Sequence, residues 1–406
     1  MNLLQLCHRI PFPPVDGGNI AMYNLSQSLV LQGNTVKIFA LNTLKHFVKT
    51  NELPLAFKEE MRLEAVTADT SVRSFDAFMN LFTNESYNIT RFYSKEFEER
   101  LAVLLRAELF DIIQIESLFM MPYLDCIRKN SSAKIVMRAH NVEHIIWERL
   151  CQSERNIFEK LYLEILVKRL KAYELKSMNL VDGILPITKD DETIFKNLGC
   201  KVPIHVTPLG INLNDYKISE IEKPEWCLFH LGSMDWMPNL EAIDWFLGNC
   251  WKPIRIEFPG LKLFLAGRGF PKRLMEAGYP NVICEGEISD SNQYMRNKQM
   301  MIVPLLSGSG MRVKIIQGMA LGKTIISTSI GAEGIQCTNN ENILIADTPQ
   351  QFFEAIKKCL GDKTFAEQIG KSARKLVAEK YSNEVIGKGV VEFYMQLRKN
   401  LNENLH

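Results

Sequence analysis

The amino-acid sequence predicts an α/β protein made of two Rossmann-like, doubly wound parallel-sheet domains that face each other across a cleft. Three observations support this prediction. Both halves of the chain alternate short apolar runs with amphipathic helical stretches, the pattern of parallel strands joined by crossover helices. The chain has 406 residues, too many for one ordinary core, so two domains of about 200 residues are expected. A charged stretch at 219–225 separates the two series and is the expected boundary.

The N-terminal series begins with an apolar strand at Leu3–Leu6, followed by a Pro/Gly loop at 11–18. An amphipathic helix follows, and Gly33 is expected to end it, because glycine accepts the left-handed conformation found after helices. A second strand at Val36–Leu41 completes a parallel unit with a right-handed crossover. Further strands are predicted at 112–115, 135–138 and 183–187, with one long helical stretch over 145–178.

The C-terminal series follows a Pro/Gly turn around 205–212 and the charged stretch. Strands are predicted at 227–231, 262–266, 282–285, 300–304 and 324–328, and helices at 240–247 and 311–321. The chain ends in an amphipathic helix around 383–401. Two doubly wound sheets of this kind bind ligands at the carboxyl ends of their strands, which is where functional residues are expected.

The composition is that of an ordinary globular protein, with 46% apolar and 23% charged residues. The formal net charge of +1 argues against nucleic-acid binding, which normally shows as a basic excess. Nine scattered cysteines, none in a Cys-x-x-Cys pair, fit a reducing compartment. The N-terminus has no signal-peptide pattern, and no apolar run approaches the roughly 20 residues of a transmembrane helix. A cytoplasmic protein is therefore expected.

The loop before the first predicted helix contains Asp16, Gly17 and Gly18. Glycines let the backbone come close to a ligand, and the amides at a helix start favour an anion such as a diphosphate. The same residues also fit an ordinary strand-to-helix turn. Taken alone, paired glycines favour the ordinary turn.

A second glycine-rich loop, with Gly308, Ser309 and Gly310, follows an apolar strand and opens the helix that carries Arg312 and Lys314. Its backbone amides and the helix dipole would attract an anion. Cations at a helix start oppose the dipole, so a bound anion would explain their position. The alternative is a glycine-rich turn followed by a solvated basic first turn, but the pattern favours an anion site.

His140 lies in the segment RAHNVEH, directly after a predicted strand. At this end of a parallel sheet a histidine can donate a hydrogen bond to a substrate hydroxyl or to a developing charge. A single histidine is more often structural, and both interpretations stay open. No metal site is predicted, because the sequence has no Asp-x-Asp pair and no cysteine–histidine array.

Three segments together resemble the retaining glycosyltransferases of family four, which have the GT-B architecture. They are RAHNVEH at 138–144, GSMDWMPN at 232–239 and VPLLSGSGMRVKIIQGMALGKTIISTSIGAEGI at 303–335. The resemblance spans almost the whole chain and is strongest to members of surface-polysaccharide and cell-wall biosynthesis. It implies an acceptor-side domain over 1–210, with the helix at 385–406 packing back on it, and a donor-binding domain over 211–384.

The resemblance implies transfer of a sugar from a nucleotide-diphosphate-sugar to a glycan or lipid-linked acceptor, with retention of anomeric configuration. Neither a metal nor a resident cofactor is implied, since the donor itself is a substrate. By this resemblance, the diphosphate would be bound by Arg312, Lys314 and the glycine amides of both loops. Gln317 would hold the ribose and His140 the sugar. Further donor-side candidates are Gly232, Ser233 and Glu333.

The sequence departs from the family at two glutamates that members commonly carry with seven residues between them. Gln317 stands at the second of these positions, and Ser309 stands eight residues earlier. A glutamine still binds ribose hydroxyls but loses the charge-assisted bond, at a cost of about 1 kcal/mol in donor binding. Many relatives also place an arginine where Ser233 lies and a lysine just beyond it. Here their role would pass to Arg312 and Lys314.

Two other functions stay open at this level. A degenerate nucleotide-sugar-binding protein without transfer activity would explain Gln317, and an epimerase on the same architecture would need carboxylates in the cleft. A further hypothesis is peripheral contact with the inner face of a membrane. It rests on aromatic residues at 75–97 and basic residues at 168–176. The alternative is that the aromatic residues belong to the core and the basic residues form a solvated face of a helix. The partners expected are thus the donor and the acceptor, and no nucleic acid.

Overall fold

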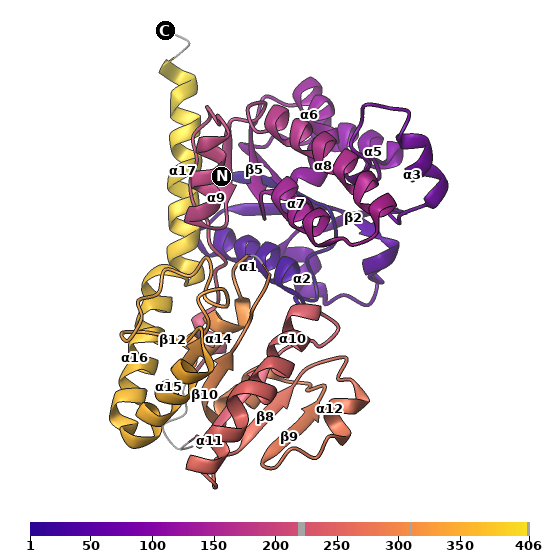
Figure 1. The fold of residues 1–406 in the computed structure, drawn as a ribbon. Helices are drawn as coiled ribbons and strands as arrows, with labels where there is room; N and C mark the ends of the chain where they lie inside the picture. The colour runs from indigo at the N-terminus through magenta and orange to yellow at the C-terminus, as the bar shows by residue number, and fades with distance from the viewer. Residues whose placement is uncertain (218–223, 309, 404–406) are drawn as a thin grey trace. The chain divides into compact units, whose positions relative to one another are not determined.

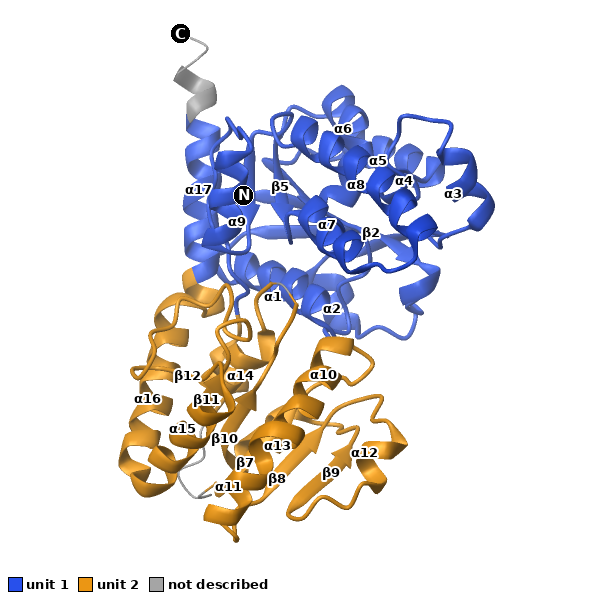
Figure 2. Cartoon of the chain, in the orientation of Figure 1, with its two compact units in different colours: residues 1–210, 386–406 blue, residues 211–385 orange. Residues whose placement is uncertain are grey.

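The computed structural model describes residues 1–217, 224–308 and 310–403, with the side chains of 400–403 left aside. Most of the predicted boundary stretch at 219–225, and Ser309 of the second glycine-rich loop, therefore lie outside the described residues. The chain divides into two compact units (Figure 2). Unit 1 comprises Met1–Gly210 together with the C-terminal segment from Ile386, and unit 2 comprises Ile211–Val385.

Unit 1 is built on a six-stranded sheet in the order β3-β2-β1-β4-β5-β6 (Figure 1). All pairings are parallel in the described residues. The strands are β1 (Asn2–Cys7), β2 (Thr35–Thr43), β3 (Glu64–Ala68), β4 (Ile112–Glu116), β5 (Lys134–Ala139) and β6 (Gly183–Pro186). The helices are α1 (Gly17–Leu31), α2 (Leu55–Glu60), α3 (Ser74–Asn80), α4 (Tyr87–Thr90), α5 (Lys95–Ala107), α6 (Leu124–Asn130), α7 (Glu143–Ser153), α8 (Ile157–Ser177), α9 (Lys189–Asn197) and α17 (Asn383–Glu403).

Unit 2 repeats the design, with a second six-stranded parallel sheet in the order β12-β11-β10-β7-β8-β9. Its strands are β7 (Glu225–Leu231), β8 (Leu263–Ala266), β9 (Val282–Gly286), β10 (Lys298–Val303), β11 (Thr324–Ser327) and β12 (Leu344–Ile345). Its helices are α10 (Met237–Phe246), α11 (Lys252–Glu257), α12 (Lys272–Glu276), α13 (Ser291–Arg296), α14 (Val313–Ala320), α15 (Pro349–Gly361) and α16 (Lys363–Lys380). The predicted α/β class with two doubly wound parallel sheets is confirmed.

Apolar side chains on both faces of the unit 1 sheet explain why helices cover it on two sides. Neighbouring residues of a strand point to opposite faces, so Leu3 packs in one core and Leu4 in the other. One core takes α1 and α17, the latter through Val390 and Phe393. The other takes α5, α6, α8 and α9. The last helix of the chain is thus part of the unit 1 core.

The direction of winding reverses between β1 and β4 in unit 1 and between β7 and β10 in unit 2. At such a point the connections leave to opposite sides, so the loops at the carboxyl ends of the two strands diverge and leave space for a ligand. A ligand site is therefore expected among the residues that follow β1, β4, β7 and β10.

The long helix predicted over 145–178 is wrong in one respect, because the structure breaks it into α7 and α8. The Asn156 side chain accepts hydrogen bonds from the amides of Phe158 and Glu159 and so starts a new helix. The helix predicted at 311–321 begins later, at Val313, because Gly308 and Gly310 adopt φ of 114° and 81° and keep the preceding segment out of a helix.

Candidate functional site

Three polar side chains meet where β1, β4 and β5 end in unit 1. His8 follows β1, Glu116 ends β4 and His140 follows β5. Nε2 of His140 lies 2.7 Å from Oε2 of Glu116, and the rings of His8 and His140 meet edge to face with centroids 6.0 Å apart. This cluster stands at the reversal point of the unit 1 sheet, as the topology predicts for a ligand site.

Glu116 is the anchor of this cluster and is fully buried. Arg138, also fully buried, lies 3.7 Å from the Glu116 carboxylate and donates a hydrogen bond to the carbonyl of Ala21. Burial, the largest influence, acts to raise the pKa of Glu116, but the Arg138 charge and the His140 hydrogen bond together hold that pKa below its usual value. Glu116 is therefore ionised, and its acceptor role fixes a hydrogen on Nε2 of His140.

His8 completes the cluster as a neutral ring. Its Nδ1 lies 3.2 Å from the Glu116 carbonyl oxygen, which can only accept, so Nδ1 carries the hydrogen. Burial and the neighbouring His140 lower the pKa of His8 to about 3. The ring thus presents a bare Nε2 at neutral pH. Neither His8 nor Glu116 was predicted from the sequence, although the polar run Gln-Ile-Glu at the end of a buried strand was a signal.

The first glycine loop is organised by an ion pair. Asp16 caps α1 by accepting a hydrogen bond from the Asn19 amide, and both of its carboxylate oxygens receive hydrogen bonds from Arg9, at 2.7 and 2.9 Å. A Cβ on Gly18 would lie 2.4 Å from the Arg9 guanidinium. Gly18 therefore leaves the space that the Arg9 side chain occupies. The start of α1 already has a carboxylate beside it, that of Asp16.

Glu143 and His144, at the end of the RAHNVEH segment, make contacts with α8 instead. Glu174 of α8 accepts hydrogen bonds from the amides of Glu143 and His144 and so caps α7. It also lies 2.6 Å from Nδ1 of His144. Burial and the nearby Glu174 raise the pKa of Glu143 to about 7. These contacts join α7 to α8, whereas Arg138 and His140 of the same segment contact Glu116 in the cluster at the strand ends.

In unit 2 the loops after β7 and β8 pack closely through glycines. A Cβ on Gly232 would lie 2.6 Å from His230, and one on Gly267 would lie 1.9 Å from the Gly232 carbonyl oxygen. Gly267 also has a φ of 141°, which side chains rarely tolerate. Ser233 lies in the same loop, where its hydroxyl is 3.4 Å from Asp235. Gly232 and Ser233 thus belong to a compact turn at the reversal point.

The second glycine loop is shaped around Arg312. The Arg312 side chain donates from Nη1 to the Gly310 carbonyl at 2.8 Å, and its guanidinium carbon lies 5.3 Å from the centre of the Trp236 ring. A Cβ on Gly308 would lie 2.7 Å from Arg312 and 3.1 Å from Trp236. Gly308 therefore leaves room for the guanidinium to lie over the ring, which holds a cation at the end of β10.

Lys314 is a cation for which the described residues offer no counter-charge. It lies in the first turn of α14, and its ammonium has no hydrogen-bond acceptor and no carboxylate partner among the described residues. Burial, and then the charge of Arg268, lower the pKa of Lys314 to about 8. Arg268 follows β8 in the sequence Gly-Arg-Gly and was not predicted as a site residue, although a cation between two glycines after a buried strand was a usable signal.

Glu333 stands on the loop after β11. One of its carboxylate oxygens is buried and has no hydrogen-bond partner within the described part of the chain. Burial lowers the pKa of Arg312, and the nearby Glu333 charge acts in the opposite direction. Gly308, Gly310, Arg312, Lys314 and Glu333 are therefore grouped around the end of β10, while Ser309 lies outside the described residues.

Gln317 lies one turn further along α14. Its Nε2 donates to the hydroxyl of Tyr216 at 3.0 Å. The amide nitrogen is thus used inside unit 2, and the amide oxygen is left as the atom that could accept from a ligand hydroxyl. Arg374 in turn donates to the Tyr216 carbonyl at 2.7 Å, so Tyr216 is fixed at both ends.

Two further features bear on function. No group of three or more histidine, cysteine, aspartate or glutamate side chains in the described residues could hold a metal ion. None of the helices in the same residues is long and apolar enough to cross a membrane.

Comparison with known proteins agrees with this architecture. Residues 226–362 match the model of a family described as glycosyl transferases group 1. A Klebsiella pneumoniae protein, described as an uncharacterized 44.6 kDa protein in the cps region, is 24% identical over 290 residues, which cover 68% of this chain and 72% of that protein.

Two solved structures of low sequence identity share the fold over nearly their whole length. Sucrose-phosphate synthase from Thermosynechococcus elongatus has a TM-score of 0.70 at 16% identity, covering 98% of this chain and 99% of that chain. Anabaena HepE in complex with UDP has a TM-score of 0.67 at 12% identity, covering 98% and 100%. The chain therefore has the GT-B fold of these structures, and its residues 226–362 match the model of the glycosyl transferases group 1 family.

Proposed function

We propose that this protein is a glycosyltransferase that moves a sugar from a nucleotide-diphosphate-sugar to a glycan or lipid-linked acceptor, with retention of anomeric configuration. The family of residues 226–362 and the cps-region relative support the transferase class and a role in polysaccharide biosynthesis. The structures of HepE with UDP and with UDP-glucose support a nucleotide-sugar as the donor.

The single observation that carries the proposal is the position of Lys314. A partly buried ammonium without a carboxylate costs free energy, since burial removes water that is not replaced. A dianionic diphosphate at the end of β10 would supply the missing counter-charge. Arg312 and Arg268 bring two more cations to the same end of the sheet, as a diphosphate leaving group requires.

The remaining unit 2 candidates take roles around the same ligand. The amides of Gly308 and Gly310 would donate to phosphate oxygens, next to the loop that carries Gly232 and Ser233. Gln317 would accept from a ribose hydroxyl through its amide oxygen. Glu333 would accept from a hydroxyl of the donor, because its unpartnered oxygen would be repelled by the diphosphate itself.

In unit 1 we assign the sugar-binding role to His140. The Glu116 carboxylate holds its Nε2 hydrogen, so the ring is oriented and only Nδ1 remains for a substrate hydroxyl. The start of α1 was expected to bind the diphosphate through Gly17 and Gly18, and the structure limits which groups there can do so. Since Asp16 already places a carboxylate at the start of α1, only the amides of the two glycines remain as candidate donors to the diphosphate.

The reaction we propose needs no pair of enzymic carboxylates. The acceptor would attack from the side of the leaving group, and the diphosphate oxygen would take its proton, while the cations stabilise the departing charge. The chemistry is thus supplied by charge stabilisation and positioning, without a resident cofactor or metal. This distinguishes the proposal from an epimerase, which would interconvert the donor without any acceptor.

Binding and turnover of the donor test this proposal. Isothermal titration calorimetry of UDP-, GDP- and ADP-sugars should find one donor that binds the wild-type protein and loses at least tenfold in affinity in Arg312→Ala/Lys314→Gln. The exposed pair Lys388→Gln/Lys399→Gln loses the same charge elsewhere and serves as the matched control. If a donor binds but is not turned over with the glycan and lipid-linked acceptors tested, the degenerate nucleotide-sugar-binding protein replaces the transferase proposal; if no donor binds, both are excluded.

We propose further that the protein is cytoplasmic and contacts a membrane peripherally, and an exposed apolar surface of unit 1 supports the membrane contact. Exposed apolar side chains stand on and beside α3 and on the first half of α8; they are Val72, Phe75, Phe78, Met79, Phe82, Ile157, Phe158, Leu161 and Ile165. Phe158 is 84% exposed and Phe82 is 75% exposed, far beyond what a core would leave in water. Arg169 of α8 connects this helix to the end of α3 by donating hydrogen bonds to the carbonyls of Asn80 and Leu81.

The aromatic residues at 75–97 divide into a buried and an exposed group. Part of them, including Phe92 and Phe97, are core, but Phe75, Phe78 and Phe82 are not. We propose that they insert among lipid headgroups, where a lipid-linked acceptor would be met. The protein should float with vesicles containing phosphatidylglycerol, and Phe75→Ser/Phe158→Ser should stay at the bottom of the gradient. A wild-type protein that does not float removes the membrane proposal and leaves the donor site untouched.

A further inference from the structure

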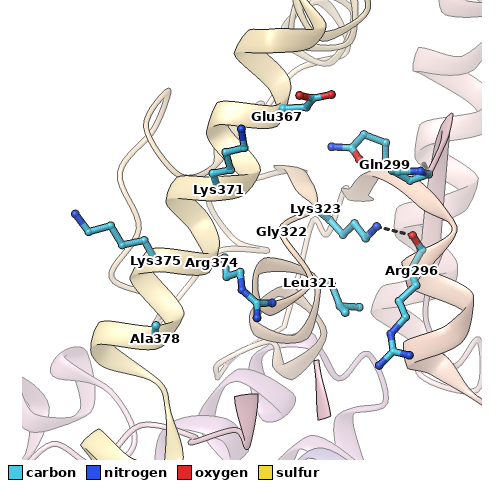
Figure 3. Close-up of a pocket in the computed structure, with 11 residues that line it drawn as sticks. Arg296, Gln299, Leu321, Gly322, Lys323, Glu367, Lys371, Arg374, Lys375 and Ala378 are labelled. Carbon is cyan, nitrogen blue, oxygen red and sulfur yellow. Dashed lines mark hydrogen bonds between the residues drawn. The ribbon is translucent and has the colours of Figure 1, made fainter. Parts of the chain in front are cut away.

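A cavity of about 510 Å³ lies in unit 2, away from the strand ends described above (Figure 3). Arg296 lies two residues before the start of β10, and Lys323 immediately precedes β11, so the cavity is at the amino ends of these strands. The candidate donor site is at their carboxyl ends. Six residues of β10 span about 16 Å, so the two sites are separate.

The cavity is strongly basic. Five cationic side chains and a single carboxylate line it: Arg296, Lys323, Lys371, Arg374, Lys375 and Glu367. Most other buried cations of this protein have a carboxylate beside them, as Lys37 has with Glu64 and Glu108. The cavity therefore carries a net positive charge that its own residues do not neutralise.

The innermost cation is Lys323, which is only 5% exposed. Its ammonium donates to the Arg296 carbonyl at 2.7 Å and has no carboxylate partner within the described residues (Figure 3). A neutral carbonyl satisfies one of its three donors but leaves its charge uncompensated. Burial lowers the pKa of Lys323 to about 8, which reflects the cost of this arrangement.

Arg296 and Arg374, like Lys323, donate hydrogen bonds to backbone carbonyls. Arg374 donates to the carbonyls of Tyr216 and Ala320. Arg296 donates to the Asp215 carbonyl at 3.0 Å, and its buried Nε has no acceptor among the described residues. Each guanidinium is therefore positioned by backbone oxygens, with donors and a full charge left over.

Capping of helix ends explains only part of this cluster. Arg296 ends α13 and Ala320 ends α14, so Lys323 and Arg374 each satisfy a terminal carbonyl. A glutamine could make the Lys323 bond without the cost of burying a charge. Capping also gives no reason for Lys371, whose side chain accompanies Arg374 on the same face of α16 three residues away.

The rim of the cavity can adapt to a ligand. Lys371 is exposed, and Lys375 is 76% exposed with its ammonium 3.8 Å from Glu379. In Figure 3 the Lys375 ammonium points away from Lys323. Lysine side chains carry a compact charge on a flexible stem, so both can turn toward an anion that Lys323 and Arg296 hold from below.

We propose that this cavity binds a compact anion with two or more phosphate groups, at a site distinct from the donor site. Its volume lies in the range of small-molecule sites, and its excess of cations matches a multiply charged ligand better than a single carboxylate. The phosphates can belong to a free metabolite or to a phospholipid headgroup, which present the same chemistry to the lysines.

Calorimetric titration with sodium triphosphate tests the site. The full-length Lys314→Gln variant is the background, since it weakens anion binding at the donor site. Triphosphate should still bind this background, and adding Lys323→Gln/Lys371→Gln should lower its affinity at least tenfold. Adding Lys388→Gln/Lys399→Gln, an equal loss of charge on exposed positions of unit 1, should leave it within twofold.

Two outcomes would overturn the proposal. One is that triphosphate binding disappears with Lys314→Gln alone, which would assign all binding to the donor site. The other is an unchanged affinity in Lys323→Gln/Lys371→Gln. Because Lys323 is buried, Lys371→Gln alone is the second test; its exposed side chain can be removed without unfolding the protein, and it should still weaken binding several-fold.

The source of the phosphate is decided in a parallel experiment. Cosedimentation with vesicles containing cardiolipin, a lipid with two phosphate groups, is compared with vesicles of phosphatidylcholine alone, in the Phe75→Ser/Phe158→Ser background. Vesicle binding that depends on Lys323 and Lys371 assigns the site to a headgroup, and triphosphate binding without vesicle binding assigns it to a free metabolite. If neither probe depends on these lysines, the site does not exist.

Discussion

The Glu116 carboxylate and the His140 ring form a hydrogen bond of 2.7 Å at the ends of two neighbouring strands. Parallel register sets Glu116 opposite Arg138, and His140 stands two residues further on. The sheet thus brings an ionised carboxylate, its buried counter-ion and a histidine to one point. It makes Glu116 a positioning residue, because the role proposed for His140 depends on the hydrogen that Glu116 holds on Nε2.

Glu116→Gln should lower kcat about 100-fold with a smaller change in the donor KM, because the amide no longer orients and polarises His140. It should also reduce the free energy of unfolding by about 3 kcal/mol, since Arg138 loses its only carboxylate partner in the described residues. Steady-state kinetics and urea unfolding measure the two effects.

The matched control is Glu174→Gln, which removes a second buried carboxylate that contacts a histidine, at 2.6 Å. This variant should lose stability, while kcat per folded molecule stays near the wild-type value. Equal losses of kcat in both variants would show that Glu116 matters only for folding.

Donor affinity should depend on pH through Lys314. The free protein holds this ammonium with a pKa of about 8. Below pH 8 the lysine is charged and ready to bind a diphosphate; above it, binding must first take up a proton, so affinity should fall about tenfold per pH unit. Lys314→Arg stays charged throughout, so its affinity should be flat from pH 8 to 9. Titrations at four pH values decide this, and a parallel decline in both proteins would exclude Lys314 as the cause.

The same lysine should reduce the stability of the ligand-free protein. Its folded pKa of about 8 lies below the ordinary value of 10.5, so the cost of burial is fully present below pH 8 and is relieved between pH 8 and pH 10.5. Lys314→Gln should therefore raise the free energy of unfolding at pH 7 by about 1–2 kcal/mol while weakening donor binding. Chemical denaturation at pH 7 measures the gain. A variant that is less stable than wild type would mean that Lys314 has a stabilising partner instead.

Gln317→Glu should strengthen donor binding about fivefold, which corresponds to about 1 kcal/mol for a charge-assisted bond to a ribose hydroxyl. Tyr216 can support the change, because its hydroxyl can donate to a carboxylate where it now accepts from the amide. Calorimetry with the best donor measures the affinity. Tyr216→Phe, which removes the hydroxyl that contacts Gln317, is measured beside it. If Gln317→Glu binds the donor no better than the wild-type protein, the ribose does not contact residue 317.

Much of the fold follows from the sequence because it rests on local patterns. Apolar runs bounded by turns predicted β1, β2, β4, β5 and β6, and Gly33 takes a φ of 76° just after the residue that caps α1, as its position suggested. The short edge strands β3 and β12 were not predicted. β3 is only partly buried and β12 has two residues, so neither has the apolar contrast on which periodicity depends.

Residues close in sequence could likewise be grouped into a candidate site, as with Gly308, Gly310, Arg312 and Lys314 on one loop and helix start. Their mutual arrangement could not be predicted. Whether Arg312 lies over Trp236, and whether Lys314 has a partner, depends on side chains that come from other loops. Those contacts form only when β7, β8 and β10 are side by side.

The class of fold could be inferred from the period of the apolar residues, and the resemblance to glycosyltransferases from three short segments. Which ionisable groups meet became known only from the folded chain. Glu116 and His140 are 24 residues apart, and Lys323 reaches the Arg296 carbonyl across 27 residues. Burial and pairing set the charge of such groups, and both are properties of the folded neighbourhood, which no local pattern contains.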